Sequence, residues 1–322
     1  MTAAGGAIKD WTVSVPRLPF SMPGRLLAPL LALLAASQPA ASQSVIWRSV
    51  TPTDISGPAA FKNPRLSESS GLAVSRTQPG IYWTHNDSGD DPVLYATDSL
   101  GRDLGMFWVT GAKNYDWEAI ARAPCDGGDC LYIGDTGDNT ERRKTVAVYK
   151  VREPIVQPGA GTLVTDSAFR LVIKYPDGPH DTEALVVAPS GDLLLITKGR
   201  SHGVRLFRVA ATAWHEPAPA LAQFIAQLPI EPSARTGRRV TDAALAPDGK
   251  RVVVRTYSGL FFFMLDGYRL TPADPPVVCE TGALQLQGEG VDWLPDGRLA
   301  LSSEAALGMG RGSLAFLRCP TQ

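Results

Sequence analysis

Short apolar runs alternate with turn-forming residues along the chain from residue 45 onward. The runs are rich in Val, Ile, Leu, Phe and Tyr, and Gly, Pro, Asp and Asn separate them. No long segment shows the 3.6-residue repeat of an amphipathic helix. Runs of four to eight such residues between turn signals are typical of strands. The pattern therefore predicts an all-β protein.

A two-strand phrase recurs five times within this pattern. Each copy has an acidic residue near its start, a short apolar strand, a turn containing Pro, Gly or Asp, and a second strand. The copies begin at Glu68, Asp116, His180, Val240 and Gly288. Self-similarity at intervals of about 50 to 65 residues is the signature of a propeller with four-stranded blades.

One or two further strands follow each phrase, but the fifth copy is one strand short. Residues 44–51 precede the first copy and provide the natural outer strand of that last blade. A blade built from both ends of the chain closes the ring and protects its edges. We therefore expect a single propeller of about five four-stranded blades, closed by an N-terminal strand. A six-bladed ring with one degenerate blade is the alternative.

The beginning of the chain has the features of an export signal. Arg25 supplies a positive charge, residues 26–36 are rich in Leu and Ala, and Ala40, Ala41 and Ser42 supply small residues for cleavage. The apolar run is shorter than the ~20 residues of a spanning helix, so a retained anchor is the less favoured reading. The predicted parts are an extension or upstream start over 1–21, a signal peptide over 22–42 and the propeller domain over 43–322.

Charge and cysteine content fit an exported globular domain. The 31 basic residues nearly balance the 32 acidic ones, which argues against nucleic acid as a partner. None of the four cysteines has the Cys-x-x-Cys spacing of a zinc site, and an oxidising compartment favours disulfides. Of the three connectivities, we expect Cys125–Cys130 and Cys279–Cys319. The protein is expected in the periplasm or the medium, as a monomer with no membrane span after signal cleavage.

The acidic residues of the repeats predict a common site, because the first strand of each propeller blade lines the central channel. The candidates are Glu68, Asp116 or Glu118, Asp181 or Glu183, Asp242, and Glu289. Neighbouring carboxylates raise one another's pKa unless a cation intervenes. Calcium, which takes 6–8 oxygen ligands, is one such cation. The alternatives are salt bridges to Arg142, Lys198, Arg200 and Arg255, or hydrogen bonds to backbone amides of the adjacent blade.

Two oxygen-rich turns, 86–91 and 135–139, follow the second strands of neighbouring blades. They could meet on one rim and hold calcium or a polar ligand, or be ordinary Asx turns. His85 and His180 stand beside this acidic material as candidate bases or ligands. The predicted metal ligands are Glu68, Asn86, Asp87, Glu118, Asp135 and Glu183. The predicted ligand-binding residues are His85, Asp138, Asn139, Lys198, Arg255, Glu289 and Glu304.

The remaining sequence signals concern packing and reaction class. Trp83, Trp117 and Trp293 lie in or next to inner strands and are predicted to pack between blades. No Gly-x-Ser-x-Gly elbow, His-Glu-x-x-His helix or Walker loop occurs in the sequence. The signatures of the common serine hydrolases, zinc proteases and NTPases are therefore absent.

Three phrases connect the chain to known propellers: Trp-Thr-His-Asn-Asp-Ser-Gly, Asp-Trp-Glu-Ala-Ile-Ala and Gly-Asp-Thr-Gly-Asp-Asn. In these phrases the chain resembles secreted bacterial β-propeller proteins of uncertain function. It is more distantly similar to the gluconolactonase and senescence-marker propellers and to the propeller phytases. That resemblance implies a metal at the channel mouth, with Glu68, Asn86 and Asp87 matching the family's ligands, and a metal-activated water that attacks a lactone or phosphate ester.

The sequence leads to one main functional expectation and one alternative. We expect an exported, calcium-stabilised propeller that serves as a binding or scaffold module. Its partner would be a small molecule, a glycan or a protein that contacts an acidic site at the channel mouth. The alternative is a metal-dependent hydrolase of a lactone or phosphate ester.

Overall fold

The computed structural model describes residues 2, 14–16, 45–157, 159, 161–305 and 310–320. The predicted signal peptide, 22–42, lies outside the described residues, as does nearly all of the predicted extension. The chain divides into two units, 1–41 and 42–322, and the fold below is that of the second. Among the described residues, no helix is long and apolar enough to cross a membrane.

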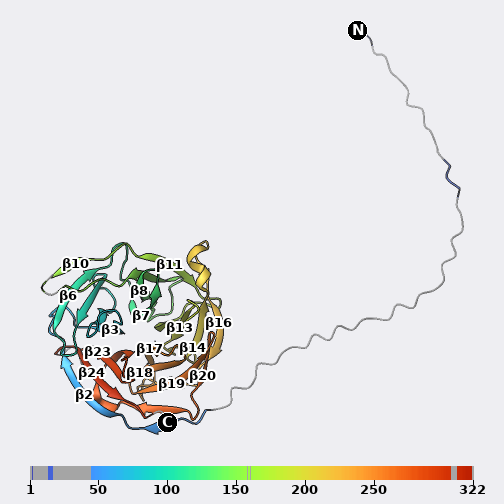
Figure 1. Ribbon diagram of the computed structural model, residues 1–322. Helices are drawn as coiled ribbons and strands as arrows, with labels where there is room; N and C mark the ends of the chain where they lie inside the picture. The colour runs from blue at the N-terminus through green and yellow to red at the C-terminus, as the bar shows by residue number, and fades with distance from the viewer. Residues whose placement is uncertain are drawn as a thin grey trace. The chain divides into compact units, whose positions relative to one another are not determined.

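Five small, mainly antiparallel sheets surround a central axis and form a five-bladed propeller (Figure 1). Each inner strand contacts the inner strands of the two neighbouring blades, so the ring is closed. The inner strands are β3 (Ser69–Val74), β7 (Trp117–Cys125), β12 (Thr182–Val187), β17 (Val240–Leu245) and β22 (Gly288–Trp293). They are almost wholly buried, including the polar and acidic residues that they carry.

Three further strands complete each blade from the axis outward. The second strands are β4 (Tyr82–Asn86), β8 (Gly128–Asp135), β13 (Leu193–Thr197), β18 (Arg251–Thr256) and β23 (Leu299–Ser303). The third strands are β5 (Val93–Thr97), β9 (Val146–Arg152), β14 (Arg205–Val209), β19 (Gly259–Asp266) and β24 (Ser313–Arg318). The outer strands are β6 (Asp103–Trp108), β11 (Phe169–Lys174), β16 (Gln223–Gln227), β21 (Val277–Glu280) and β2 (Thr53–Ala60).

An N-terminal strand closes the ring, but it is not the predicted segment 44–51. The outer strand of the fifth blade is β2, which pairs antiparallel with β24 (Figure 1). Within 44–51, only β1 (Arg48–Val50) is a strand, and it pairs in parallel with β21 of the fourth blade. Residues 44–51 have the apolar pattern of a strand, but it is the next segment, β2, that reaches β24 and pairs with its free edge.

The same arrangement occurs at two other blade edges. β10 (Thr162–Val164) precedes β11 in the chain and pairs in parallel with β6 of the preceding blade. β15 (Ala220–Leu221) precedes β16 and pairs in parallel with β11. We call β1, β10 and β15 the lacing strands, because each ties one blade's connection to the edge of the blade before it. They cover strand edges that would otherwise be open to other chains.

A separate apolar cluster fills each of the five blade interfaces. Trp83, Trp117 and Trp293 are 0, 0 and 3% exposed, which confirms their predicted packing role. Each indole N–H still finds an acceptor: Glu153 for Trp83, and main-chain carbonyls for the other two. Burying a large aromatic side chain contributes ~1.5–3 kcal/mol, so these clusters hold the blades together.

Both predicted disulfides are present. Cys125–Cys130 closes the β7–β8 hairpin, and Cys279–Cys319 connects β21 of the fourth blade to the end of β24 in the fifth. The remaining elements are β20 (Arg269–Pro272), which forms a hairpin with β19, and two 3₁₀ helices at Ala211–His215 and Gly282–Leu284.

Candidate metal site

The inner strands carry β-bulges that place carboxylates in the channel. The register shifts between β7 and β8 at Glu118, between β12 and β13 at Glu183, and between β17 and β18 at Thr241. A similar irregularity in β22 includes Glu289. A bulge leaves one residue unpaired and turns its side chain, and bulges often occur beside functional sites.

The register separates the predicted acidic ring into two layers. Ser69, Trp117, Thr182, Val240 and Gly288 open the inner strands and pair with the last residues of the second strands. One position before them stand Glu68, Asp116 and Asp181, which form the outer layer. One position after them stand Glu118, Glu183 and Glu289, which form the inner layer. Asp242 belongs to neither layer.

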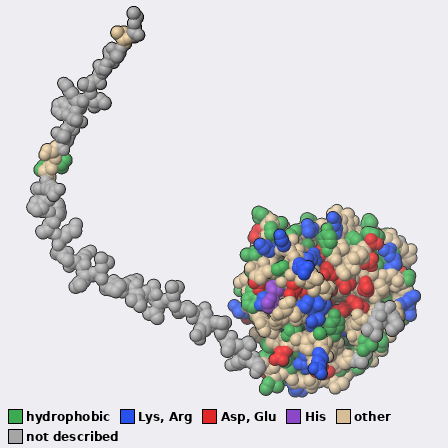
Figure 2. All heavy atoms as spheres, turned by 180° about the vertical axis from the view of Figure 1, so that it is seen from behind, with side chains coloured by type: hydrophobic (Ala, Val, Ile, Leu, Met, Phe, Trp, Pro, Cys, Tyr) green, Lys and Arg blue, Asp and Glu red, His purple; other side chains and the backbone are tan. Residues whose placement is uncertain are grey.

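Five carboxylates from three blades gather at the channel mouth where the inner strands begin. One ligand oxygen from each of Asp87, Asp116 and Glu118 lies within 4.8 Å of the others, and the same holds for Glu118, Asp181 and Glu183. We call these five residues the acidic mouth. Glu118 belongs to both groups, so it connects the site across the blades. Figure 2 shows acidic side chains gathered near the middle of one face, with Lys and Arg beside them.

The turn at 135–139 supports the acidic mouth through its main chain. Gly137 N–H donates to the Asp116 carbonyl at 3.1 Å, and Asp138 N–H donates to Oδ1 of Asp181 at 2.9 Å. A Cβ at Gly137 would lie 2.5 Å from Cγ of Asp116 and 2.7 Å from Oε1 of Glu118. Only glycine lets the backbone approach two carboxylates this closely.

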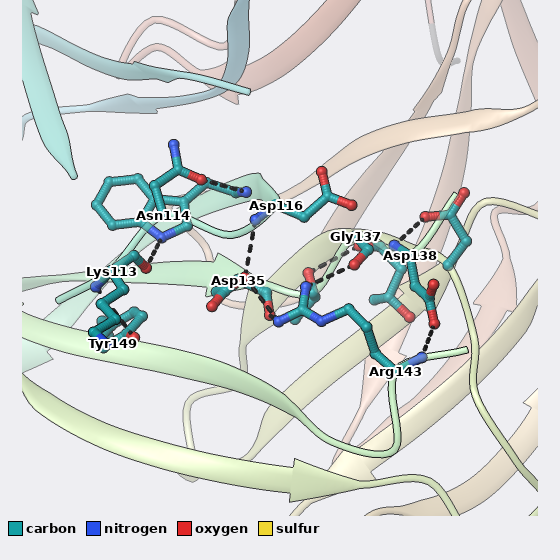
Figure 3. Close-up of polar contacts among 12 residues, drawn as sticks. Lys113, Asn114, Asp116, Asp135, Gly137, Asp138, Arg143 and Tyr149 are labelled. Carbon is teal, nitrogen blue, oxygen red and sulfur yellow. Dashed lines mark hydrogen bonds and ion pairs between the residues drawn. The ribbon is translucent and has the colours of Figure 1, made fainter. Parts of the chain in front are cut away.

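Arg143 fixes this turn from the outside (Figure 3). Its guanidinium donates to Oδ1 of Asp135 at 2.9 Å and to the Gly137 carbonyl at 2.7 Å. Oδ1 of Asp135 also accepts the Asp116 N–H at 3.1 Å. Asp135, a predicted metal ligand, is thus joined to an arginine and lies outside the two groups of clustered carboxylates.

Two cations face the third blade's carboxylates. Lys198 Nζ lies 2.7 Å from Oε1 of Glu183, and Arg200 Nε lies 2.6 Å from Oδ2 of Asp181. The predicted salt bridges of Lys198 and Arg200 are therefore formed. Burial lowers the pKa of Lys198, but Glu183 and its neighbours outweigh burial and raise it, so the ammonium keeps its charge.

The carboxyl groups of the acidic mouth hold protons more tightly than isolated carboxyl groups do. Burial, with repulsion from Asp87 and Asp181, raises the pKa of Asp116 to about 7. Burial raises the pKa of Glu183 to about 8, despite Lys198. Burial and the charge of Glu183 raise the pKa of Glu118 well above its ordinary value. These carboxyl groups lack enough positive charge around them.

The donor set fits a hard divalent cation. All of its atoms are carboxylate oxygens, which suit calcium or magnesium rather than a softer transition metal. Oδ1 of Asp116 and, nearby in the inner layer, Oε2 of Glu289 are buried with no hydrogen-bond partner among the described residues. Such atoms are costly to leave unpaired, and a cation would satisfy them.

Several predicted metal ligands and bases lie outside the two groups of clustered carboxylates. Asn86 accepts the Glu68 N–H and donates to the Arg65 carbonyl, so its amide holds a loop, and the Glu68 side chain is exposed. His85 is fully buried against Trp117, and burial lowers its pKa to about 4. His180 is also buried, with Nε2 2.9 Å from Oδ1 of Asp177.

The other predicted ligand-binding residues are divided between rim and interior. Glu304 lies near Asp87 and Glu68, and burial raises its pKa to about 7. Arg255 is buried and donates to main-chain carbonyls and to Gln285. Asp138 accepts the Arg143 N–H, and Asn139 accepts from Arg200.

Asp242 has the packing role that was one of the predicted alternatives. Its Oδ2 accepts the Val291 N–H of the next blade at 2.8 Å, and Oδ1 accepts its neighbour's N–H. Asp292 repeats this arrangement toward Val74 of the first blade at 2.7 Å. These acids fix blade-to-blade packing and do not face the acidic mouth.

Arg143, Tyr257 and the structural role of Gly137 were not predicted from the sequence. A signal for Tyr257 does exist, because the residues just after the second strands occupy equivalent places in the repeat. They are Asp87, Thr136, Lys198, Tyr257 and Glu304. Lys198 Nζ lies 5.9 Å from the Tyr257 ring centroid, so two of these equivalent positions do meet.

Comparisons with known proteins find distant structural relatives. No family model matches the sequence, and no curated protein matches it. The PQQ-bound aldose sugar dehydrogenase of Streptomyces coelicolor is 13% identical, over 84% of this chain and 99% of that one, with a TM-score of 0.47. A glucose dehydrogenase is 12% identical, over 83% and 99%, with a TM-score of 0.46.

A gluconolactonase from Xanthomonas campestris is also similar in structure. It is 12% identical over 78% of this chain and 72% of that one, with a TM-score of 0.42. Function depends on the site rather than on the fold, and identities this low carry no activity from one protein to another. The chain is thus similar in structure to two sugar dehydrogenases and a gluconolactonase, and this similarity concerns the fold alone.

Proposed function

We propose that the acidic mouth binds calcium and that the bound ion stabilises the propeller and presents a ligand site to solvent. The observation that carries this proposal is the position of Glu118, whose carboxylate lies within 4.8 Å of carboxylates from three blades. Lys198 and Arg200 each pair with an acid of the third blade. Among the residues that the structure describes, the group formed by Asp87, Asp116 and Glu118 has no salt-bridge partner.

An exported binding module is the role that this site supports best. All four cysteines are paired, as is common in oxidising compartments, so we place the protein in the periplasm or outside the cell. Asp87 and Asp116 are half-buried, whereas Glu118 is buried, so a cation held by these three keeps coordination positions toward solvent. Those positions suit oxygen atoms of a small molecule, a glycan or a protein side chain.

A thermal melt tests the metal site. The purified protein is melted in EDTA, and then with calcium or magnesium added. A ligand at about 100 times its Kd adds ~2.7 kcal/mol to the native state, so calcium should raise the Tm by roughly 5 °C. Glu118→Gln keeps the shape and the acceptor for Ser70 Oγ but removes the shared charge, and it should abolish this shift.

Glu280→Gln is the matched control, because Glu280 is a half-exposed acid of β21 that hydrogen-bonds Ser49. It should retain the full calcium shift. A wild-type protein that melts at the same temperature with and without calcium would contradict the proposal.

Metal-assisted hydrolysis of a lactone or phosphate ester is the second candidate. The half-exposed Asp87 and Asp116 favour it, since a cation there could hold both water and substrate. The metal would polarise the reacting oxygen, while Glu118 and Asp116 held it in place. Assays with lactones and phosphate esters should then show turnover that needs calcium and is lost in Glu118→Gln. Calcium binding without turnover would leave only the binding module.

A further inference from the structure

The other end of the channel carries two arginines. Arg76 follows β3 and Arg122 lies in β7, and both line a groove of about 580 Å³ formed by the first four blades. We call this groove the arginine mouth. Its remaining walls are largely apolar and include Pro124, Pro189 and Pro247. Its volume lies within the range typical of small-molecule sites.

The acids of this end do not satisfy both arginines. Asp129 Oδ2 pairs with one terminal nitrogen of Arg122 at 2.7 Å. Asp292 accepts from the Val74 and Trp293 N–H groups, one with each oxygen, at 2.7 Å. Among the described residues, Arg76 has neither a hydrogen bond nor an ion pair. Asp292 and Asp129 interact with Arg76 only electrostatically, without a hydrogen bond or ion pair among the described residues.

The Nε atoms of Arg76 and Arg122 are both buried and unpartnered among the described residues. Burial, and after it the nearby charge of Arg122, lowers the pKa of Arg76, although Asp292 and Asp129 act in the opposite direction. A guanidinium is a planar set of donors that matches a carboxylate or phosphate with two parallel hydrogen bonds. An anion between the two arginines would satisfy donors that the protein leaves unused.

We propose that the arginine mouth binds a small organic anion. Its carboxylate or phosphate group would lie against Arg76 and Arg122, and its apolar body would lie against the proline-lined walls. This site is separate from the acidic mouth and does not depend on a bound metal. The propeller would then have a cation site at one end of its channel and an anion site at the other.

Isothermal titration calorimetry of the purified protein tests this inference. Benzoate and inorganic phosphate are titrated separately, with EDTA present so that metal at the acidic mouth cannot contribute. Benzyl alcohol serves as the neutral counterpart of benzoate. We expect benzoate to bind more tightly than phosphate, because it has both the charge and the apolar body, and benzyl alcohol to bind at least tenfold more weakly than benzoate.

Arg76→Gln should weaken benzoate binding by about tenfold or more, since a hydrogen bond to a charged group contributes ~1.5–3 kcal/mol. Arg76→Lys keeps the charge but loses the planar pair of donors, and it should bind with intermediate affinity. Arg170→Gln, a change at an exposed arginine of β11, should bind as the wild type does. Circular dichroism and the Tm show that each variant is folded.

Three results would show that the arginine mouth is not an anion site. The first is that neither anion binds the wild type. The second is that Arg76→Gln and Arg76→Lys both bind benzoate as the wild type does. The third is that Arg170→Gln weakens binding as much as Arg76→Gln, because that would show attraction by overall charge rather than a site. Tighter binding of phosphate than of benzoate would indicate that the site binds an inorganic oxyanion, and it would contradict the proposal that the ligand is organic.

Discussion

Buried acids near the axis have opposite roles because they differ in which donors reach them. Asp242 is fully buried, and both of its oxygens accept main-chain N–H groups. Glu118 is also buried, but within the described part of the chain only Ser70 donates a hydrogen bond to its side chain, and Glu118 belongs to both groups of clustered carboxylates. An acid whose oxygens accept main-chain N–H groups has a structural role. An acid that lies beside other carboxylates without such donors is a candidate metal ligand, because a cation would relieve the repulsion between them.

Asp242→Ala should therefore destabilise the protein without affecting calcium binding. The change leaves the Val291 N–H unpaired at a blade interface, which costs ~1–3 kcal/mol. Urea denaturation measures this loss, and the calcium-dependent shift in Tm should match that of the wild type. A lost calcium shift with unchanged stability would assign Asp242 to the site instead.

Gly137→Ala should weaken calcium binding because the new methyl group would press on Asp116 and Glu118. The added Cβ would lie within 2.7 Å of atoms in both side chains, so at least one carboxylate must move. We expect the calcium shift in Tm to fall by more than half in the same EDTA and calcium melts. A full shift would show that the two carboxylates can separate and still bind the ion.

At the scale of elements, β2 is the strand on which ring closure depends. It pairs with β24, whose Leu314 and Phe316 belong to the cluster between the fifth and first blades. A chain that begins at residue 61 lacks β1 and β2 and leaves the β24 edge open. We expect it to aggregate or to melt well below a chain that begins at residue 45. Equal solubility and Tm would contradict this role for β2.

The repeats allowed the sequence to predict the number of blades, the inner strands and closure by the N-terminus. The outer strand of the last blade was misplaced because residues 44–51 and 53–60 both lie between the predicted signal peptide and the first repeat. The structure distinguishes the two segments. Residues 48–50 form the lacing strand β1, which is equivalent to β10 and β15, and residues 53–60 form the outer strand β2. Each lacing strand is only two or three residues long, which is too short to show the alternation of apolar and polar residues that identifies a strand in a sequence.

The acidic site was predicted only in part because bulges decide its geometry. The sequence shows one acidic position near the start of each repeat, but a shift of one residue moves a side chain to another face. Thr241 occupies the bulge in the fourth blade, so the neighbouring Asp242 faces an interface. Glu68 stands in the outer layer for the same kind of reason.

At the scale of the whole molecule, the two disulfides should differ in their contribution to stability. Cys279–Cys319 spans 40 residues and joins two blades, whereas Cys125–Cys130 spans 5 residues within one hairpin. Loop-closure entropy gives about 4 kcal/mol for the long loop and about 2 kcal/mol for the short one. The paired Ser variants, compared by guanidinium denaturation, should show this order, and the reverse order would contradict it.

The pH dependence of stability follows from the raised carboxyl pKa values. Burial raises the pKa of Asp116 and Glu304 to about 7 and that of Glu183 to about 8. Between their ordinary and raised values, the folded protein binds protons that the unfolded chain has released. Stability should therefore rise as pH falls from 8 toward 5.

His85 opposes this trend only below about pH 6.5, since its pKa is lowered to about 4. In EDTA, the Tm should be higher at pH 6 than at pH 8. Calcium should reduce or reverse the difference, because metal ligands must be deprotonated. A higher Tm at pH 8 in EDTA would contradict the raised pKa values.

The pairing of β2 with β24 also determines when the protein can fold. Thr53 Oγ1 donates to the Arg318 carbonyl across 265 residues of chain. The strand β2 therefore has no partner until β24 has been synthesised. Contacts of this range form slowly, because the intervening chain must be brought together first. The ring therefore cannot be completed before residues 313–318 have been synthesised and are free to pair with β2. Until then, β2 lacks its partner strand and is open to pairing with other chains, so the growing polypeptide is most exposed to aggregation during this interval.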